Sequence, residues 1–101
     1  MPNTYNDISF WIPDVNIIND KWTIENDFFE IVRDIGDIWV EKIELKDKFY
    51  HSKKMMNSRT YRIYYSPDSE MKNPAEFIKI ANEHHKLIQT TLESKLGIVI
   101  R

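Results

Sequence analysis

Residues 38–65 decide the fold of this chain and read IWVEKIELKDKFYHSKKMMNSRTYRIYY. Both ends of the stretch are rich in β-branched and aromatic residues with polar residues interleaved, which is typical of strands with one buried face and one solvated face. We therefore predict two strands, Ile38–Leu45 and Thr60–Tyr65, joined by a basic loop over residues 46–59. From Lys46 to Arg62 there are six Lys or Arg and one Asp, a charge of +5 in a chain of net charge −2. A basic hairpin with aromatic rings favours a polyanion that also offers flat faces for stacking.

The length and composition indicate one modest globular domain over residues 1–101. The chain is 42% apolar and 30% charged, and it has no run approaching the roughly 18 apolar residues that would suggest a membrane-spanning helix. It contains no cysteine, which excludes disulfides, iron–sulfur clusters and zinc sites with thiolate ligands. Five acids and one Arg between Glu25 and Asp37 set the negative charge apart from the basic hairpin.

Before the hairpin the sequence predicts a strand and a helix. Residues 6–12 alternate between apolar and polar side chains and end at Pro13, which indicates a half-buried strand followed by a loop over residues 15–22. Thr23 or Asn26 is expected to cap a helix that ends at Gly36, with Gly36 in the left-handed conformation. The apolar stripe of this helix consists of Phe28, Ile31, Val32 and Ile35.

A longer helix and a short strand are predicted after the hairpin. Asn73 is expected to cap the helix, with Pro74 at its first position and Glu76 three residues after the cap. Gly97 ends the helix, and residues 98–101 form the last strand. The order β-α-β-β-α-β predicts an α+β, ferredoxin-like sandwich with a four-stranded antiparallel sheet, both helices on one face, and the other face bare.

Motifs along nearly the whole chain resemble one family. They are residues 7–13 (DISFWIP), 25–28 (ENDF), 32–36 (VRDIG) and 40–45 (VEKIEL), followed by Asp47, Phe49, His51, Lys53, Ser58 and residues 61–63, 85–86, 88–89 and 96–98. In this order they resemble the ferredoxin-fold anticodon-binding domain, the C-terminal domain of organellar phenylalanyl-tRNA synthetases. The resemblance implies a non-catalytic module, part of a longer ligase, that binds the anticodon stem-loop of tRNA-Phe.

The resemblance also implies the partners and the location of the chain. A separate catalytic domain of the same synthetase would use ATP and Mg²⁺, whereas this chain would hold no cofactor and no metal. We expect a soluble monomer in the mitochondrial matrix or plastid stroma, with no membrane partner and no aminoacylation activity of its own.

In this family the bare sheet face takes the first anticodon base, a guanine. The resemblance places the base site on Ser9 (through its backbone), Asp47, Phe49, Ser58 and Ile98, with Trp11, Lys53 and Arg62 as further tRNA contacts. Asp47 would accept hydrogen bonds from the guanine edge, Phe49 would stack, and Ser58 would hydrogen-bond. Ile98 stands where some relatives have an aromatic residue, which implies apolar contact in place of stacking.

The strand alternation sets a condition on this site. If Tyr61, Ile63 and Tyr65 face the helices, then Ser58, Thr60, Arg62 and Tyr64 lie on the bare face beside Ser9 and Trp11. Asp47 and Phe49 share their parity with Ile43 and Leu45, so placing them on the bare face requires a β-bulge or a strand end near Lys46. We expect backbone phosphate contacts from Lys46, Lys48, Lys53, Lys54 and Arg62.

The residues alone leave two other functions open. Trp11, Phe49, Tyr50 and Tyr64 are also suited to a protein-docking patch, and ferredoxin-like folds include small-ligand regulatory domains. We expect His84 on the buried stripe of the long helix, His85 near the helix edge, and His51 either solvated or against a phosphate or base. No pattern of catalytic residues and no metal-ligand set is recognisable.

Overall fold

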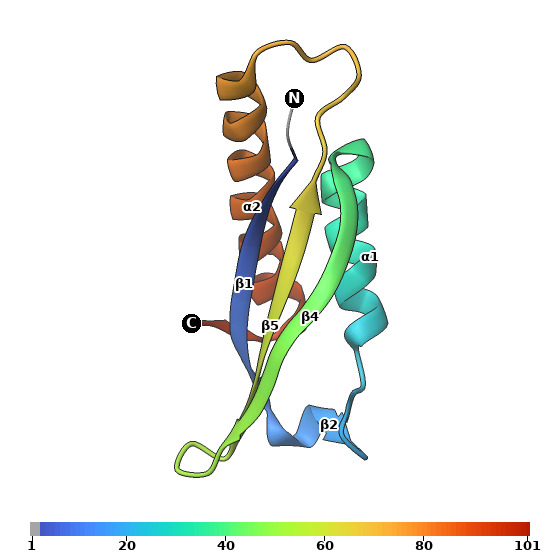
Figure 1. The fold of residues 1–101 in the computed structure, drawn as a ribbon. Helices are drawn as coiled ribbons and strands as arrows, with labels where there is room; N and C mark the ends of the chain where they lie inside the picture. Colours follow the sequence, from blue (N-terminus) through green and yellow to red (C-terminus); the bar gives the residue numbers. More distant parts are fainter. Residues whose placement is uncertain (1–2) are drawn as a thin grey trace.

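The computed structural model describes residues 3–101 and shows two helices packed on one face of a four-stranded antiparallel sheet (Figure 1). The strand order is β4-β5-β1-β6, as a ferredoxin-like topology requires. The molecule is elongated, 47 Å long and 20 Å across. The main elements are β1 (Thr4–Pro13), α1 (Glu25–Gly36), β4 (Val40–His51), β5 (Met56–Tyr65), α2 (Pro74–Leu96) and β6 (Val99–Ile100).

The hydrophobic core lies between the sheet and the two helices, and it confirms the predicted alternation. On β5, Tyr61, Ile63 and Tyr65 are buried, and Arg62 and Tyr64 between them are half-exposed on the opposite face. Successive residues of a strand point to opposite faces of the sheet. Both helices cover the face that carries the buried residues, so the opposite face stays open (Figure 1). The other buried core residues are Ile8, Phe10, Ile12, Trp22, Phe28, Val32, Val40, Phe77, Ala81, Ile88, Leu92 and Ile98.

The segment predicted as a loop over residues 15–22 has structure of its own. A 3₁₀ turn (Asp14–Asn16) leads into a small hairpin of β2 (Ile17–Ile18) and β3 (Lys21–Trp22). Trp22 anchors this hairpin, because its ring lies 5.2 Å from the Phe10 ring and 5.5 Å from the Phe28 ring, between ring centroids. One buried aromatic residue gives no periodicity, so the sequence could not show the anchor.

The predicted caps of α1 are wrong. Ile24 is the N-cap residue, and no side chain caps the helix. Tertiary contacts hold this helix end instead: Arg59 Nη1 lies 2.9 Å from Glu25 Oε2, and the Tyr61 hydroxyl donates to the same oxygen. Burial raises the pKa of Tyr61 above its usual range, which keeps this donor protonated. Arg59, which the sequence places among the charges of a basic loop, is 5% exposed and structural.

Gly36 ends α1 for a different reason from the one predicted. Its backbone is right-handed, with φ of −73°, and the positive φ that ends the helix falls on Asp37, at 47°. A Cβ on Gly36 would overlap Cγ2 of Val40, so this position needs glycine for close approach. Gly97, by contrast, ends α2 in the left-handed conformation that the sequence predicts for a C-terminal glycine, with φ of 67°.

The two glycines therefore predict different responses to alanine. Gly36→Ala should cost about 1–3 kcal/mol of unfolding free energy because it overpacks the contact with Val40. Gly97→Ala should cost about 1 kcal/mol through backbone strain alone, since nothing lies within 4 Å of the added carbon. Urea denaturation of the single variants and of each combined with Val40→Ala would check this. Val40→Ala should partly rescue Gly36→Ala and leave the cost of Gly97→Ala unchanged; equal additivity in both pairs would contradict the account.

The start of α2 is as predicted, but its buried stripe differs at the histidines. Asn73 Oδ1 accepts from the backbone N–H of Ala75 at 3.0 Å and of Glu76 at 3.4 Å. The stripe runs through His85, which is buried, whereas His84 is half-buried beside the Trp39 ring. The predicted order of burial for the two histidines is therefore wrong.

His85 provides a hydrogen-bond partner for a backbone carbonyl at the outer edge of β1, beyond the residues that pair with β6. Within residues 3–101, β6 pairs with Phe10 and Trp11 alone, and His85 Nε2 lies 3.1 Å from the carbonyl oxygen of Asp7. A carbonyl only accepts, so Nε2 carries the hydrogen; in the neutral ring Nδ1 then accepts from the Tyr65 hydroxyl, 3.3 Å away. This arrangement requires the neutral ring, and burial lowers the pKa of His85 below its usual value.

The stability of the fold should therefore fall in mild acid. The unfolded chain protonates His85 near pH 6.5 and the folded chain only at lower pH, so the unfolded state binds more protons as the pH falls below 6.5. Urea unfolding at pH 7.5 and 5.5 should show a loss of up to about 1.4 kcal/mol per pH unit from this residue. His85→Gln should show a smaller loss over the same interval. An identical pH dependence in both proteins would rule this coupling out.

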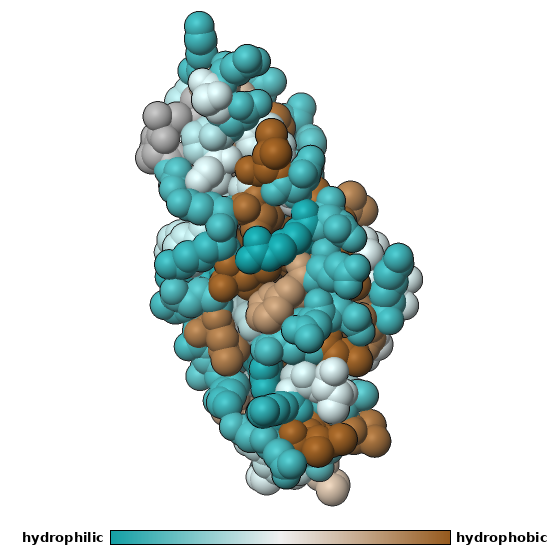
Figure 2. All heavy atoms as spheres, turned by 90° about the vertical axis from the view of Figure 1, so that its right-hand side faces the viewer, coloured by the Kyte–Doolittle hydropathy of each residue, from teal (hydrophilic) through white to brown (hydrophobic). Residues whose placement is uncertain are grey.

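The flank that carries α1 and the free edge of β4 is mainly hydrophilic. Figure 2 shows this side, on which hydrophobic residues appear as separate patches. The outer face of α1 contributes exposed Asp27, Glu30 and Asp34. Within residues 3–101 neither helix is long and apolar enough to cross a membrane.

Candidate nucleic-acid interface

The hairpin of β4 and β5 forms a long arm that extends past the ends of both helices (Figure 1). The predicted loop over residues 46–59 is wrong, because β4 continues to His51 and β5 begins at Met56. Only residues 52–55 form the turn, in which the His51 ring accepts a hydrogen bond from the backbone N–H of Lys54 at 3.2 Å. Near its tip the arm lies beyond the helices, so the apolar alternation that reveals a strand is missing there.

A β-bulge at Lys46 decides which residues of β4 reach the open face of the sheet. Leu45 pairs with Tyr61 and Asp47 pairs with Thr60, so Lys46 is an extra residue on one side of the ladder. The alternation of β4 is therefore reversed beyond Lys46, and Asp47 and Phe49 move from the helix-facing side to the open face. The sequence analysis required a β-bulge or a strand end near Lys46 for the base site, and the structure has the bulge.

Trp11, Ser58 and Phe49 lie side by side on neighbouring strands of the open face. The Trp11 and Phe49 rings meet edge to face, with 6.0 Å between centroids. Arg101 lies over both rings, with Cζ at 5.0 Å from the Trp11 centroid and 5.2 Å from the Phe49 centroid. Its Nη1 also donates to Ser58 Oγ at 2.7 Å. We call these four residues the aromatic–arginine cluster.

The next row along the same face carries hydroxyls and a carboxylate. Ser9 pairs with Thr60 across β1 and β5, and their hydroxyl oxygens lie 2.7 Å apart. Asp47 pairs with Thr60 from the other side and is exposed. Among residues 3–101 no cation forms an ion pair with Asp47. The open face thus offers a free carboxylate one row from the stacking rings.

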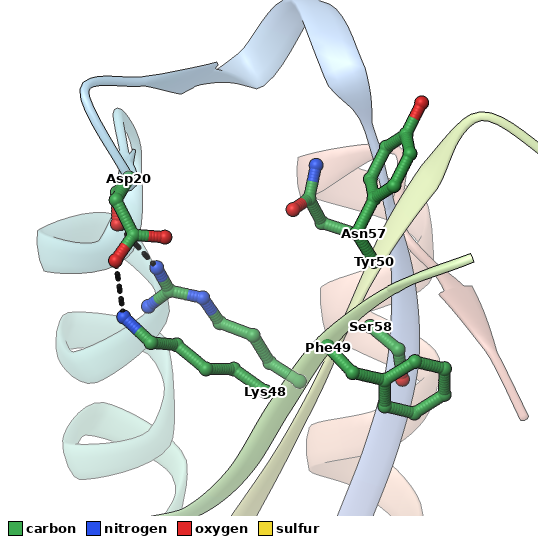
Figure 3. A pocket seen from close by; sticks show the side chains of 7 residues that line it. Asp20, Lys48, Phe49, Tyr50, Asn57 and Ser58 are labelled. Carbon is green, nitrogen blue, oxygen red and sulfur yellow. Dashed lines mark hydrogen bonds and ion pairs between the residues drawn. The ribbon is translucent and has the colours of Figure 1, made fainter. Parts of the chain in front are cut away.

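The helix-facing side of the arm is built differently. Figure 3 shows Lys48 and Phe49 leaving β4 in opposite directions, with Lys48 Nζ 2.6 Å from Asp20 Oδ2. Tyr50 and Asn57 lie together beside a hollow of about 150 Å³. Lys48 thereby ties the arm to the small β2–β3 hairpin and has its charge neutralised.

Most of the basic charge in this stretch is paired with carboxylates. Arg62 forms two hydrogen bonds to Asp7, at 2.8 and 3.1 Å, which lower the pKa of Asp7 and raise that of Arg62. Lys46 lies 2.9 Å from Glu44, whose pKa it lowers. With Lys48 and Arg59 also paired, the cations near the tip that form no ion pair within residues 3–101 are Lys53, Lys54 and Arg101.

Relatives of known name cover almost the whole of this chain. A scan against protein-family models finds no match. The chain is 37% identical over 97 residues to the mitochondrial phenylalanine–tRNA ligase of Rattus norvegicus, and 36% identical over 101 residues to the probable mitochondrial enzyme of Drosophila melanogaster. The chloroplastic/mitochondrial ligase of Arabidopsis thaliana is 32% identical over 100 residues. The chain is homologous to organellar phenylalanine–tRNA ligases.

The homology covers one segment of each ligase. These alignments span 96–99% of the chain but only 18–21% of the relatives, so the chain matches about a fifth of the length of each of these ligases. The family resemblance carried by the sequence motifs is thereby confirmed. These relatives are named as mitochondrial or chloroplastic enzymes, in agreement with the predicted organellar location.

The structure brings five of the eight predicted site residues together. Ser9, Trp11, Asp47, Phe49 and Ser58 lie in two adjacent rows on the open face. The hydroxyl of Ser58 is already bonded to Arg101, and the residue is 1% exposed beneath the cluster.

The other three predicted residues lie elsewhere. Ile98 is 3% exposed in the core between sheet and helices, so the expectation that it lines the base site is wrong. Arg62 is on the open face, two residues beyond Thr60 on β5, but bound to Asp7. Lys53 is exposed in the turn at the tip of the arm.

Sequence reasoning missed Arg101, and it did not foresee the contact of Lys54 with Trp11 or the hydrogen bond between Thr60 and Ser9. Arg101 and Lys54 both lie against Trp11, with Lys54 Nζ 4.6 Å from the ring centroid. Thr60 joins Ser9 through its hydroxyl. The alternation of the last strand gave a usable signal for Arg101: with Ile98 and Ile100 facing the core, Val99 and Arg101 must face the open side. In the part of the chain described here, no cluster of three potential metal ligands occurs.

Proposed function

We propose that this chain is the anticodon-binding module of an organellar phenylalanine–tRNA ligase and that its open sheet face holds the anticodon loop of tRNA-Phe. The observation that carries the proposal is the bulge at Lys46, which sets Asp47 and Phe49 beside Trp11 and the Ser9–Thr60 pair. Homology to ligases that aminoacylate tRNA supports the choice of RNA.

The chemistry of the open face suits an unpaired base. The Phe49 ring is 40% exposed and can stack on a base that has left the RNA stack, as aromatic residues do in single-stranded RNA recognition. The free carboxylate of Asp47 accepts hydrogen bonds only. Guanine presents two adjacent donors, N1–H and N2–H₂, on its Watson–Crick edge, so Asp47 favours guanine.

The remainder of the ligase would supply catalysis. Since the chain matches about a fifth of each relative, ATP, Mg²⁺ and phenylalanine would bind to a separate catalytic domain that is the partner of this module in the organelle. This chain would contribute position and specificity for the tRNA and no aminoacylation activity.

Phe49→Ala tests the role of the open face. Loss of one stacked base should weaken binding of a tRNA-Phe anticodon stem-loop by about 5- to 150-fold, the equivalent of roughly 1–3 kcal/mol. Tyr50→Ala is the matched control: it lies on the same strand, is 48% exposed, and faces the opposite side of the arm. Fluorescence anisotropy would measure both dissociation constants.

Three results would contradict this proposal. Unchanged affinity in Phe49→Ala would remove the stacking role, and equal losses in the two variants would remove the preference for the open face. If Phe49→Ala abolished association with a catalytic domain but left RNA binding intact, the open face would be a protein-docking surface.

The pairing of the basic residues predicts a shallow salt dependence. Lys53, Lys54 and Arg101 can neutralise phosphates without first breaking an ion pair, so log K against log salt should have a slope of about −2 for single-stranded contacts. If all five basic residues expected from the sequence made phosphate contacts, the slope would be about −3.5. Titrations between low and moderate salt distinguish the two values, and a flat dependence would contradict both.

A further inference from the structure

We propose that Arg101 reads the acceptor edge, O6 and N7, of the guanine whose donor edge faces Asp47. This inference rests on the proposed function and adds a specificity-determining residue to it. It follows from the aromatic–arginine cluster and from the position of Asp47, two residues before Phe49 on the same face of β4.

The fold holds Arg101 by both its backbone and its side chain. The backbone N–H of Arg101 donates to the Ser9 carbonyl at 2.8 Å, which fixes the residue at the edge of β1. From there the side chain crosses Trp11 to reach Ser58 on β5 and the Phe49 ring of β4. Two rings and a hydroxyl thus orient the guanidinium before any ligand binds, which lowers the entropy lost on binding.

The guanidinium keeps most of its donors free. Arginine has five N–H donors, and within residues 3–101 the hydrogen bond to Ser58 is the single one made by the Arg101 side chain. Arginine commonly pairs with guanine O6 and N7 in nucleic-acid recognition, through two N–H groups of its guanidinium. Within residues 3–101 the charge of Arg101 also forms no ion pair, unlike that of Arg62 on the same face.

Asp47 and Arg101 approach the Phe49 ring from different directions. Asp47 lies two residues earlier on the same face of β4, about 7 Å along the strand. Arg101 reaches the ring across the sheet, from beyond β1. A base bound at Phe49 would therefore lie near both a carboxylate acceptor and a guanidinium donor fork.

Guanine matches this arrangement in a way that adenine does not. Guanine carries donors on its Watson–Crick edge and acceptors at O6 and N7, which correspond to Asp47 and Arg101. Adenine has the N6 amino donor in place of O6, so it would set a donor against the guanidinium. Pyrimidines have no N7. The pair of charges therefore selects guanine by both edges.

Base analogues test the two contacts separately. The probe is a tRNA-Phe anticodon stem-loop with guanine, 7-deazaguanine (no N7 acceptor) or inosine (no N2 amino donor) at the first anticodon position. The proteins are the wild type, Arg101→Met, Arg101→Lys, Asp47→Asn and Arg33→Met. Arg33 is an exposed arginine on α1 and serves as the matched control for loss of one positive charge.

We expect 7-deazaguanine to weaken wild-type binding about 5- to 30-fold and to have no further effect on Arg101→Met. Inosine should weaken the wild type and Arg101→Met alike, and weaken Asp47→Asn less, because the amide keeps only one of the two acceptor oxygens. Arg101→Lys should behave as Arg101→Met toward 7-deazaguanine, because lysine lacks the fork. Arg33→Met should bind every probe as the wild type does.

Other outcomes overturn the inference. If the wild type binds guanine and 7-deazaguanine equally while Arg101→Met binds both more weakly, with a salt slope less steep by about 0.7, Arg101 contacts a phosphate. The comparison of probes on the wild type needs no variant, so misfolding of Arg101→Met cannot hide this result. If the wild type binds no stem-loop at all, the proposed function fails as well, which is a distinct outcome.

Discussion

One extra residue in a strand determines what the arm of this molecule presents. Without the bulge at Lys46, the alternation of β4 would carry Asp47 and Phe49 to the side that faces the helices. With it, they join Trp11, Ser58 and Arg101 on the open face. The bulge therefore turns an ordinary two-stranded arm into a surface with a ring, an acid and a guanidinium in adjacent rows.

The rest of the fold pairs four of the six basic residues between Lys46 and Arg62 with carboxylates, and these pairs help to hold the surface in place. Arg59 binds Glu25 at the start of α1, and Lys48 binds Asp20 of the small hairpin. The edge of β1 is closed by His85 near one end and by the backbone of Arg101 near the other. A stretch that is strongly basic in sequence thus has most of its charge neutralised in the folded molecule. Within residues 3–101, its two cations that form no ion pair, Lys53 and Lys54, lie in the turn at the tip of the arm.

The sequence predicted the architecture well because long periodic segments carried it. The alternation of β1 and β5, the Asn73 cap and the glycine after α2 are all local signals, and the structure confirms each of them. The failures arise where tertiary contacts replace local ones. The start of α1 depends on Arg59, and Gly36 is needed because of Val40.

The candidate site was predictable only in part, because the pairing between strands, which no local signal shows, decides which residues reach the open face. Residue parity showed that a β-bulge or a strand end was needed near Lys46, and only the strand pairing shows that it is a bulge. The strands of the arm were read as a loop because residues near its tip lack a buried face. Ile98 was placed in the site by resemblance alone, although its own alternation with Ile100 pointed to the core.

The three tryptophans offer the most direct measurement of where RNA binds. Trp11 lies on the open face, Trp22 is buried between the sheet and α1, and Trp39 stacks against Phe77 of α2, with 6.0 Å between ring centroids. An NMR titration with the tRNA-Phe anticodon stem-loop would follow the indole N–H resonance of each. The account predicts that the Trp11 resonance moves and the other two stay in place. Movement of Trp39 with Trp11 unchanged would place the RNA elsewhere and contradict the account.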